Sequence, residues 1–281
     1  MPQALNINIR KAEKADLEAL STLVLTSFSQ FSLFAYLYSP LQRDINVASE
    51  TLWYWRRRLR LGMLDPASHV IVAEATIDSE EDIPTADEDG DEGGQSRRLL
   101  DWAMQKTRER DPQFQLQTVD IGDRQTKTYI VGFAIWNVRD PPDGSPKAAT
   151  GRPPQSWLEW LEAKYIQTEW KFWKTISPRK DQDPEAFPLY LESEEKLEAM
   201  CYSTETVYYL DNVTVDFRFQ RRGIGKELIG HGLAEATRLG LKAMTEAGEK
   251  GEGLYYKLGF EKVADWEVCD MKFPVMRWTP E

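Results

Sequence analysis

Apolar residues recur along the chain with two periods, one typical of strands and one typical of helices. Residues 6–10 alternate, with Ile7 and Ile9 on one face, which predicts a first strand. Apolar side chains then recur at three- and four-residue steps from Leu17 to Phe28, which predicts an amphipathic helix. The same criteria predict a helix over 45–61 and a strand over 69–76.

The second half of the chain continues this succession of helices and strands. A Trp-rich pattern predicts a helix over 157–176, and the β-branched stretch 207–215 predicts a strand. The other predicted elements are strands over 129–138 and 241–247, further strands up to 278, and helices over 97–108, 192–200, 223–239 and 254–258. This order predicts an α/β fold, with α+β character and one mixed sheet, as a single domain over 5–278. We expect 155–201 to be a helical insertion in that domain.

The composition is that of an ordinary globular protein, with 41% hydrophobic and 29% charged residues in 281. No apolar run approaches the roughly 18 residues that span a bilayer, and the start lacks the apolar stretch of a signal peptide. We therefore expect a cytoplasmic protein with no membrane partner. Cys201 and Cys269 lie far apart and match no metal-binding spacing, so we expect two reduced thiols and no metal.

Negative charge is concentrated in one stretch of the chain. The net charge is −11, but nine Asp or Glu and no Lys or Arg lie between Asp78 and Glu92, and the rest of the chain carries only −2. We expect residues 78–95 to be a disordered acidic insertion, because so polar a stretch has little apolar surface to bury. Without an overall basic excess, we expect no nucleic-acid partner. The one basic run, within 56–60, is interpreted as a solvated helix face.

A glycine-containing loop follows the predicted strand 207–215 and opens the predicted helix 223–239. It consists of Gln220, Arg221, Arg222, Gly223, Ile224, Gly225 and Lys226. A loop that enters a helix leaves backbone N–H groups without partners inside the helix, and the helix dipole adds about half a positive charge there. Glycine lets a ligand approach the backbone closely, because no Cβ stands in the way. The loop therefore predicts a phosphate-binding site.

Two better-known phosphate-binding loops do not fit these residues. A Walker A loop needs Gly where Gln220 stands and Ser or Thr where Glu227 stands. A dinucleotide-binding fingerprint needs a third Gly where Leu228 stands. A helix start whose glycines serve only packing is the remaining alternative.

A second motif lies downstream, after one further predicted strand. Residues 251–260 read Gly-Glu-Gly-Leu-Tyr-Tyr-Lys-Leu-Gly-Phe. Together the two motifs resemble the GNAT superfamily of N-acetyltransferases, whose core carries a Gln/Arg-x-x-Gly-x-Gly/Ala loop and a later Tyr-x-x-x-Gly-Phe. They resemble more narrowly a group of uncharacterised fungal GNAT-domain proteins. The close match covers 207–263, and the rest of the chain matches only in the order of its elements.

The resemblance implies that acetyl-CoA is the co-substrate. The loop 220–226 would hold the CoA pyrophosphate, and the strand backbone at Val213 and Val215 would pair with the pantetheine arm. Tyr255, at the family's tyrosine position, would protonate the leaving thiolate. This chain has Gly248 where many family members have Asn, which removes that side chain as a contact for pantetheine.

An amine acceptor must lose a proton before it attacks a thioester, and a carboxylate is suited to take that proton. Asp211 is the first candidate, because Asp is unfavoured in a strand without a role; we expect it to share a face with Tyr209, Val213 and Val215. Glu246, at the end of the next strand, is the second candidate, and water is the third. The expected acceptor is a small-molecule or peptide amine. A non-catalytic acyl-CoA-binding or interaction protein on the same fold is the alternative function.

Overall fold

The computed structural model describes residues 5–28, 30–77, 91–110, 127–141, 156–177 and 179–280. Most of the predicted acidic insertion, residues 78–90, lies outside this part of the chain. Residues 91–95 instead belong to helix α5 (Asp91–Arg110), which begins before the predicted helix at 97–108. In the described part, no helix is long and apolar enough to cross a bilayer. Cys201 and Cys269 are free thiols, as expected.

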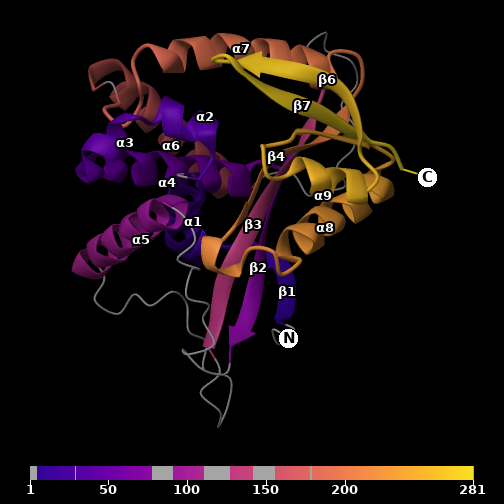
Figure 1. The fold of residues 1–281 in the computed structure, drawn as a ribbon. Helices are drawn as coiled ribbons and strands as arrows, with labels where there is room; N and C mark the ends of the chain where they lie inside the picture. Colours follow the sequence, from indigo (N-terminus) through magenta and orange to yellow (C-terminus); the bar gives the residue numbers. More distant parts are fainter. Residues whose placement is uncertain are drawn as a thin grey trace.

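Seven strands form one mixed sheet in the order β1-β2-β3-β4-β5-β7-β6, which confirms the predicted fold class (Figure 1). All neighbours are antiparallel except β4 and β5, which run parallel. The strands are β1 (Asn6–Lys11), β2 (Ser68–Ile77), β3 (Lys127–Arg139), β4 (Val207–Val215), β5 (Lys242–Glu246), β6 (Glu261–Val268) and β7 (Met271–Trp278).

Helices cover both faces of this sheet (Figure 1). Helices α8 (Ile224–Leu239) and α9 (Glu252–Lys257) pack on one face, in a core that includes Leu228, Ile229 and Tyr255. Helices α1 (Leu17–Phe28) and α4 (Ala48–Leu64) pack on the other face. The remaining helices are α2 (Ser32–Leu37), α3 (Pro40–Arg43), α6 (Trp157–Ile176) and α7 (Ala186–Tyr202).

The differences from the predicted elements have local causes. Helix α6 has the predicted bounds, but α7 begins six residues before the predicted start at 192. Its first turn contains Pro188, which is tolerated there because the missing N–H would have no partner in the helix. Helices α2 and α3 were not predicted, because six and four residues are too short to show a helical period.

Helix α8 lies against β3 through a close contact between a glycine and a tryptophan. A Cβ added at Gly232 would lie 2.0 Å from the Trp136 ring, which is fully buried and stacks on Tyr208 with ring centroids 4.9 Å apart. A Cβ added at Gly230, two residues earlier on the same helix, would meet nothing within 4 Å. The sequence places glycine at 232 because the indole ring occupies the space of a side chain.

We predict opposite effects on stability for the two glycines. Gly232→Ala should lower the free energy of unfolding by about 1–3 kcal/mol, because the methyl group overpacks the Trp136 contact. Gly230→Ala should raise it by about 0.5–1 kcal/mol, because alanine loses less backbone entropy in a helix. Urea denaturation of both variants measures the difference, and equal stabilities would contradict the close contact.

Candidate active site

The sheet opens where β4 and β5 separate. The two strands pair only at Val207–Tyr209 with Lys242–Met244, although β4 continues to Val215. The Thr245 hydroxyl donates to the Leu210 carbonyl at 3.0 Å, at the point where backbone pairing stops. Beyond it, β5 has no backbone pairing with the rest of β4. Backbone groups on that edge can therefore pair with an extended ligand.

A β-bulge at Asp211 corrects one expectation about β4. Ile135 and Trp136 of β3 pair with Asn212 and Leu210, so Asp211 is the extra residue between them. Tyr209 belongs to the core under α2 and α7, whereas Val213 and Val215 pack with the α8 core. The expected common face of Asp211 with Val213 and Val215 is therefore wrong, because the bulge shifts the alternation by one residue.

The bulge leaves Val213 and Val215 with their backbone groups at the open edge. The Val215 carbonyl accepts side-chain hydrogen bonds rather than a bond from β3, so it is directed away from β3. Residues two apart direct their backbone groups to the same edge of a strand, which places those of Val213 there too. The structure thus puts both predicted pantetheine contacts at the separation between β4 and β5.

The predicted phosphate loop connects β4 to α8 in an unusual backbone conformation. Arg221 and Gly223 have positive φ, at 61° and 86°, a region that an arginine rarely adopts. Alternating left-handed residues turn successive backbone N–H groups towards one point, which makes an anion-binding concavity. The strained Arg221, with Gly223 two residues further on, therefore supports a functional role for this loop.

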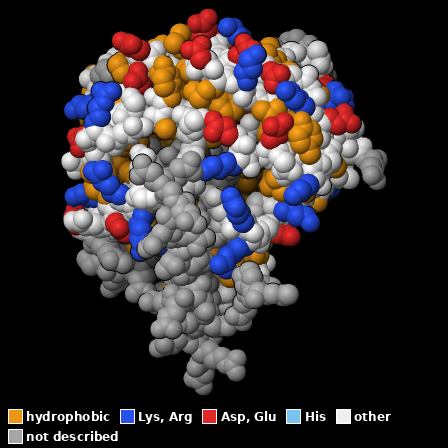
Figure 2. Space-filling view, viewed as in Figure 1, with side chains coloured by type: hydrophobic (Ala, Val, Ile, Leu, Met, Phe, Trp, Pro, Cys, Tyr) orange, Lys and Arg blue, Asp and Glu red, His pale blue; other side chains and the backbone are white. Residues whose placement is uncertain are grey.

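The start of α8 has no side-chain cap among the described residues. Gly223 is the N-cap and accepts the bond from the Glu227 N–H, so the N–H groups of Ile224, Gly225 and Lys226 precede the first intrahelical bond. A Cβ at Gly225 would make only ordinary contacts, 3.5 Å from Leu254 and 3.9 Å from Val215. Lys and Arg side chains gather near the middle of the face seen in Figure 2, around the region of this loop in Figure 1.

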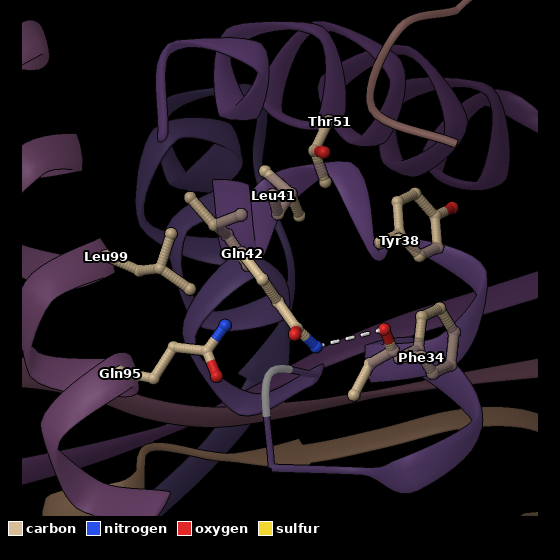
Figure 3. Close-up of a pocket in the computed structure, with 9 residues that line it drawn as sticks. Phe34, Tyr38, Leu41, Gln42, Thr51, Gln95 and Leu99 are labelled. Carbon is tan, nitrogen blue, oxygen red and sulfur yellow. Dashed lines mark hydrogen bonds between the residues drawn. The ribbon is translucent and has the colours of Figure 1, made fainter. Parts of the chain in front are cut away.

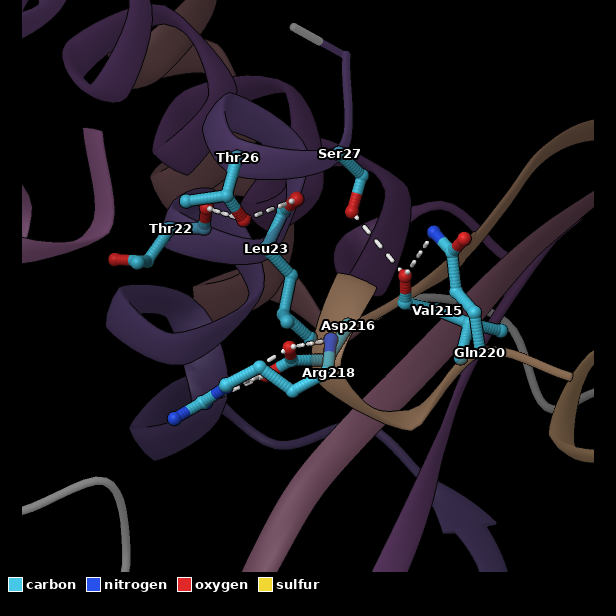
Figure 4. A network of polar contacts seen from close by, with 8 residues as sticks. All are labelled: Thr22, Leu23, Thr26, Ser27, Val215, Asp216, Arg218 and Gln220. Atoms are coloured by element: carbon cyan, nitrogen blue, oxygen red, sulfur yellow. Dashed lines mark hydrogen bonds and ion pairs between the residues drawn. The ribbon is translucent and has the colours of Figure 1, made fainter. Parts of the chain in front are cut away.

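Side chains from α1 and the loop hold the end of β4 in place (Figure 4). The Gln220 amide and the Ser27 hydroxyl each donate to the Val215 carbonyl at 3.3 Å. Asp216, almost fully buried, accepts from the Arg218 backbone N–H at 3.0 Å and forms an ion pair with its guanidinium. The Gln220 side chain therefore stabilises the loop, while the backbone N–H groups of 222–226 remain available to a ligand.

The tyrosine of the second motif is buried beside this loop. Tyr255 is 4% exposed, packs edge-on against Phe260 and shares a side-chain hydrogen bond with Thr245. Burial, and next the charge of Glu246, raise the pKa of Tyr255, so its hydroxyl keeps its proton at neutral pH. The neighbouring Tyr256 is 48% exposed, and its hydroxyl donates to Glu252 at 3.1 Å.

Glu246 is the predicted carboxylate with the most unusual environment. Its oxygen accepts a short hydrogen bond from the Tyr209 hydroxyl. Burial raises the pKa of Glu246 to about 7, with a contribution from the charges of Asp211 and Glu194, while the Tyr209 hydrogen bond opposes the shift. A carboxyl group with this pKa exchanges its proton near neutral pH, as a general base requires.

Asp211, the first candidate base, is bound to an arginine. Nη2 of Arg58, on α4, lies 3.0 and 2.9 Å from the two carboxylate oxygens. The pairing also corrects the interpretation of the basic run as a solvated face, since Arg56, Arg57 and Arg60 form ion pairs as well. Both oxygens of Asp211 are thus occupied by a cation, whereas Glu246 is hydrogen-bonded to the neutral hydroxyl of Tyr209.

Three residues of this region were not predicted as functional. Arg58 contacts Asp211, Tyr209 contacts Glu246, and Glu194 of α7 adds a carboxyl whose pKa is raised by burial. Arg58 and Asp211 are 153 positions apart, and no pattern along the sequence indicates such a pairing. Burial is the main cause of the raised pKa of both Glu194 and Glu246.

The space beside Gly248 is filled by an aromatic ring. A Cβ added there would lie 2.7 Å from Phe31, in the segment before α2. The Asn of many family members would therefore clash with this ring. Phe31 fills the space that the Asn side chain would need. Glycine at position 248 therefore goes with a different packing of this region.

A cavity between the helices lies away from the residues of the candidate site. It has a volume of about 20 Å³ and is lined by side chains of α1 to α5, among them Phe34, Tyr38 and Leu99 (Figure 3). At its edge Gln42 donates to the Ala35 carbonyl at 3.3 Å. None of the predicted site residues lines it, so it is not part of the candidate site. The described residues also contain no group of three or more His, Cys, Asp or Glu arranged to hold a metal.

Structural comparisons find acetyltransferase structures that align with nearly the whole chain. An acetyltransferase from Corynebacterium glutamicum related to histone acetyltransferase HPA2 shares 14% identity, with 98% of this chain and 97% of that chain covered and a TM-score of 0.46. The PaiA N-acetyltransferase from Thermoplasma acidophilum, in complex with coenzyme A, shares 11% identity over 98% and 99%, with a TM-score of 0.42. No curated protein sequence matches the chain. The narrower likeness to fungal proteins stays a prediction.

The family comparison gives a direct sequence match. Residues 121–260 match the model of the Acetyltransferase (GNAT) family. The matched segment contains β3, β4, the phosphate loop, α8, β5 and α9. It therefore includes every residue of the candidate site that the sequence predicted. This match to an acetyltransferase family supports acyltransferase activity of the chain.

Proposed function

We propose that the protein is an N-acetyltransferase that moves an acetyl group from acetyl-CoA to a primary amine, directly and without an acyl-enzyme. The observation that carries the proposal is the convergence at one place of the loop before α8, the open edge of β4 and the buried Tyr255. Gly225 joins the three, because its Cβ position lies 3.5 Å from Leu254, next to Tyr255, and 3.9 Å from Val215.

Acetyl-CoA binds in this proposal with its pyrophosphate at the start of α8. The N–H groups of Arg222, Gly223, Ile224 and Gly225 donate to the phosphate oxygens, and Lys226 and Arg221 add positive charge. The pantetheine amides pair with the backbone at Val213 and Val215, as a strand would at a free edge. This path directs the thioester towards Tyr255 and Glu246.

The chemistry then needs one base and one acid. Glu246 takes a proton from the ammonium form of the acceptor, and the freed nitrogen lone pair attacks the thioester carbonyl. The C–N bond forms, the C–S bond breaks, and the second proton leaves the nitrogen as the amide forms. Tyr255 gives its hydroxyl proton to the thiolate and is reprotonated, through solvent, by the second proton from the nitrogen; its raised pKa keeps the hydroxyl protonated at neutral pH until then.

The acceptor in this proposal is a cationic small-molecule or peptide amine. Burial, and to a smaller extent the charge of Asp211, raise the pKa of Glu194 and Glu246, while Arg58, which is bound to Asp211, opposes the shift of Glu194. An ammonium group entering beside them would add the positive charge that these carboxyl groups need to ionise. The charge of the site therefore supports an amine rather than an alcohol acceptor.

Gly225→Glu should lower the affinity for CoA at least about tenfold. The new side chain fills the space at the helix start and puts a like charge beside the phosphates. Isothermal titration calorimetry with CoA measures the effect. Gly230→Glu makes the same chemical change on the same helix, at a position where a Cβ meets nothing, and should bind normally. Equal affinities for the two folded variants would exclude the loop as the CoA site.

Tyr255→Phe should lower kcat on the order of 10²-fold, within the range for general acids, with little change in acetyl-CoA affinity. The substitution keeps the ring contact with Phe260 and removes only the hydroxyl. Steady-state assays with an amine panel measure kcat. Tyr256→Phe is the matched control, because that hydroxyl contacts Glu252 at the surface, and it should be nearly silent. Loss of activity in the control alone would reassign the acid.

The pH dependence of kcat/KM should show Glu246 as the base. The base acts when deprotonated, so activity should rise with pH and reach half of its limiting value near the Glu246 pKa of about 7. Glu246→Gln should lower kcat/KM by about 10²–10⁴ and remove that transition. An Asp211→Asn variant should keep the transition but move it to lower pH, because the charge of Asp211 contributes to the raised pKa of Glu246. A transition near pH 7 that persisted in Glu246→Gln would assign the base elsewhere.

A further inference from the structure

Helix α6 lies at the edge of the molecule and uses only one side for packing. It spans Trp157–Ile176, begins at a capping box of Ser156 and Glu159, and packs on α4. Of its 20 residues only Ile166 is buried. A surface helix of a soluble domain typically buries a broader apolar stripe than α6 does, so the exposed apolar residues of α6 need an explanation.

The inner side of α6 carries its acidic residues, and most of them are paired. Glu162 forms ion pairs with Arg60 at 2.7 Å and with Lys14 at 3.2 Å. Glu169 forms a bidentate ion pair with Arg57, whose Nε and Nη2 lie 3.0 and 2.7 Å from the two carboxylate oxygens. Glu159 accepts from the backbone N–H of Ser156 in the capping box. The negative charges of the helix are therefore used by contacts at its start and with α4.

The outer side of α6 is aromatic, aliphatic and cationic. At about 100° per residue, one arc of the helix collects seven large apolar side chains with Lys164 and Lys171, and no acidic residue. The apolar members and their exposed fractions are Trp157 69%, Leu158 60%, Trp160 49%, Leu161 47%, Tyr165 68%, Phe172 58% and Ile176 56%. So many exposed apolar side chains on one face mark an interaction surface.

The outer side is less polar than its sequence suggests, because the hydroxyl groups of its two threonines are hydrogen-bonded within the helix. The Thr168 hydroxyl donates to the Lys164 carbonyl at 2.8 Å, and the Thr175 hydroxyl donates to the Lys171 carbonyl at 2.9 Å. Both hydroxyl protons are thus used within the helix, and the methyl groups remain for contact. The Lys164 ammonium lies 5.9 Å from the Trp160 ring centroid, where the long side chain covers aromatic surface.

We propose that the outer side of α6 docks in the plane of an anionic phospholipid bilayer. Trp and Tyr favour the interface between headgroups and acyl chains, and Lys favours anionic headgroups, so the two features together fit a lipid surface. A helix of this length lies flat over about 30 Å of bilayer. The inference differs from the sequence-based expectation of no membrane partner, which rested on the lack of a spanning segment.

Co-sedimentation with vesicles tests the proposal on the full chain. The protein should bind vesicles of phosphatidylcholine with phosphatidylserine, should bind pure phosphatidylcholine vesicles much more weakly, and should be released by salt. Trp157→Ala/Trp160→Ala/Leu161→Ala should lower the partition coefficient at least about tenfold, through lost apolar burial. Lys164→Glu/Lys171→Glu should have a similar effect on anionic vesicles.

Matched controls change the same residue types elsewhere. Tyr36→Ala/Tyr256→Ala removes two exposed aromatics, and Lys196→Glu/Lys257→Glu reverses two exposed charges away from α6. Both should bind vesicles as the wild type does, and circular dichroism confirms folding of every variant. Wild-type protein that stays in the supernatant with anionic vesicles, or α6 variants that bind normally, would overturn the proposal. A dimer in light scattering that the Trp157→Ala/Trp160→Ala/Leu161→Ala variant abolishes, without vesicle binding, would assign the face to a second copy instead.

Discussion

Backbone hydrogen bonding between β4 and β5 stops after three residue pairs, and the candidate site depends on this interruption. Backbone N–H and C=O groups in a folded protein need partners, so a strand edge without a neighbouring strand accepts a ligand, water or a side chain. At the β4 end, Ser27 and Gln220 take part of this capacity at Val215. The other backbone groups of Val213 and Val215 at this edge are available for hydrogen bonds, between the predicted phosphate loop and Tyr255.

The bulge at Asp211 connects this opening to the charges around it. It moves Val213 and Val215 to the α8 side of the sheet while Asp211 stays in contact with Arg58 of α4. Val213 and Val215 on one side and the Arg58-bound Asp211 on the other therefore lie on opposite faces of β4. Glu246 is hydrogen-bonded to Tyr209, just before the bulge, and burial there raises its pKa although that hydrogen bond opposes the shift.

The arginines of α4 form ion pairs with three separate parts of the chain. Arg56 contacts α1, Arg57 and Arg60 contact α6, and Arg58 contacts β4. Partly exposed pairs of this kind contribute little stability individually, but they fix where neighbouring elements lie. The outer side of α6 is presented to solvent because these contacts hold its opposite side.

The sequence by itself determined the fold class, the bounds of α6 and β4, and the place of the glycine-containing loop before α8. These features depend on local periods and on short motifs, which are readable from neighbouring residues. The extent of α7 was underestimated because Pro188 looks like a helix breaker when its place in the first turn is unknown.

Only the tertiary structure decided what surrounds the two candidate carboxylates and which face of α6 is exposed. Asp211 looked the better base because Asp is rare in strands, but Arg58, 153 positions away, binds it. Glu246 acquires its pKa from burial and from Asp211 and Glu194, which belong to other elements. Such effects depend on distances in space between residues far apart in the chain, and no local pattern of the sequence encodes those distances.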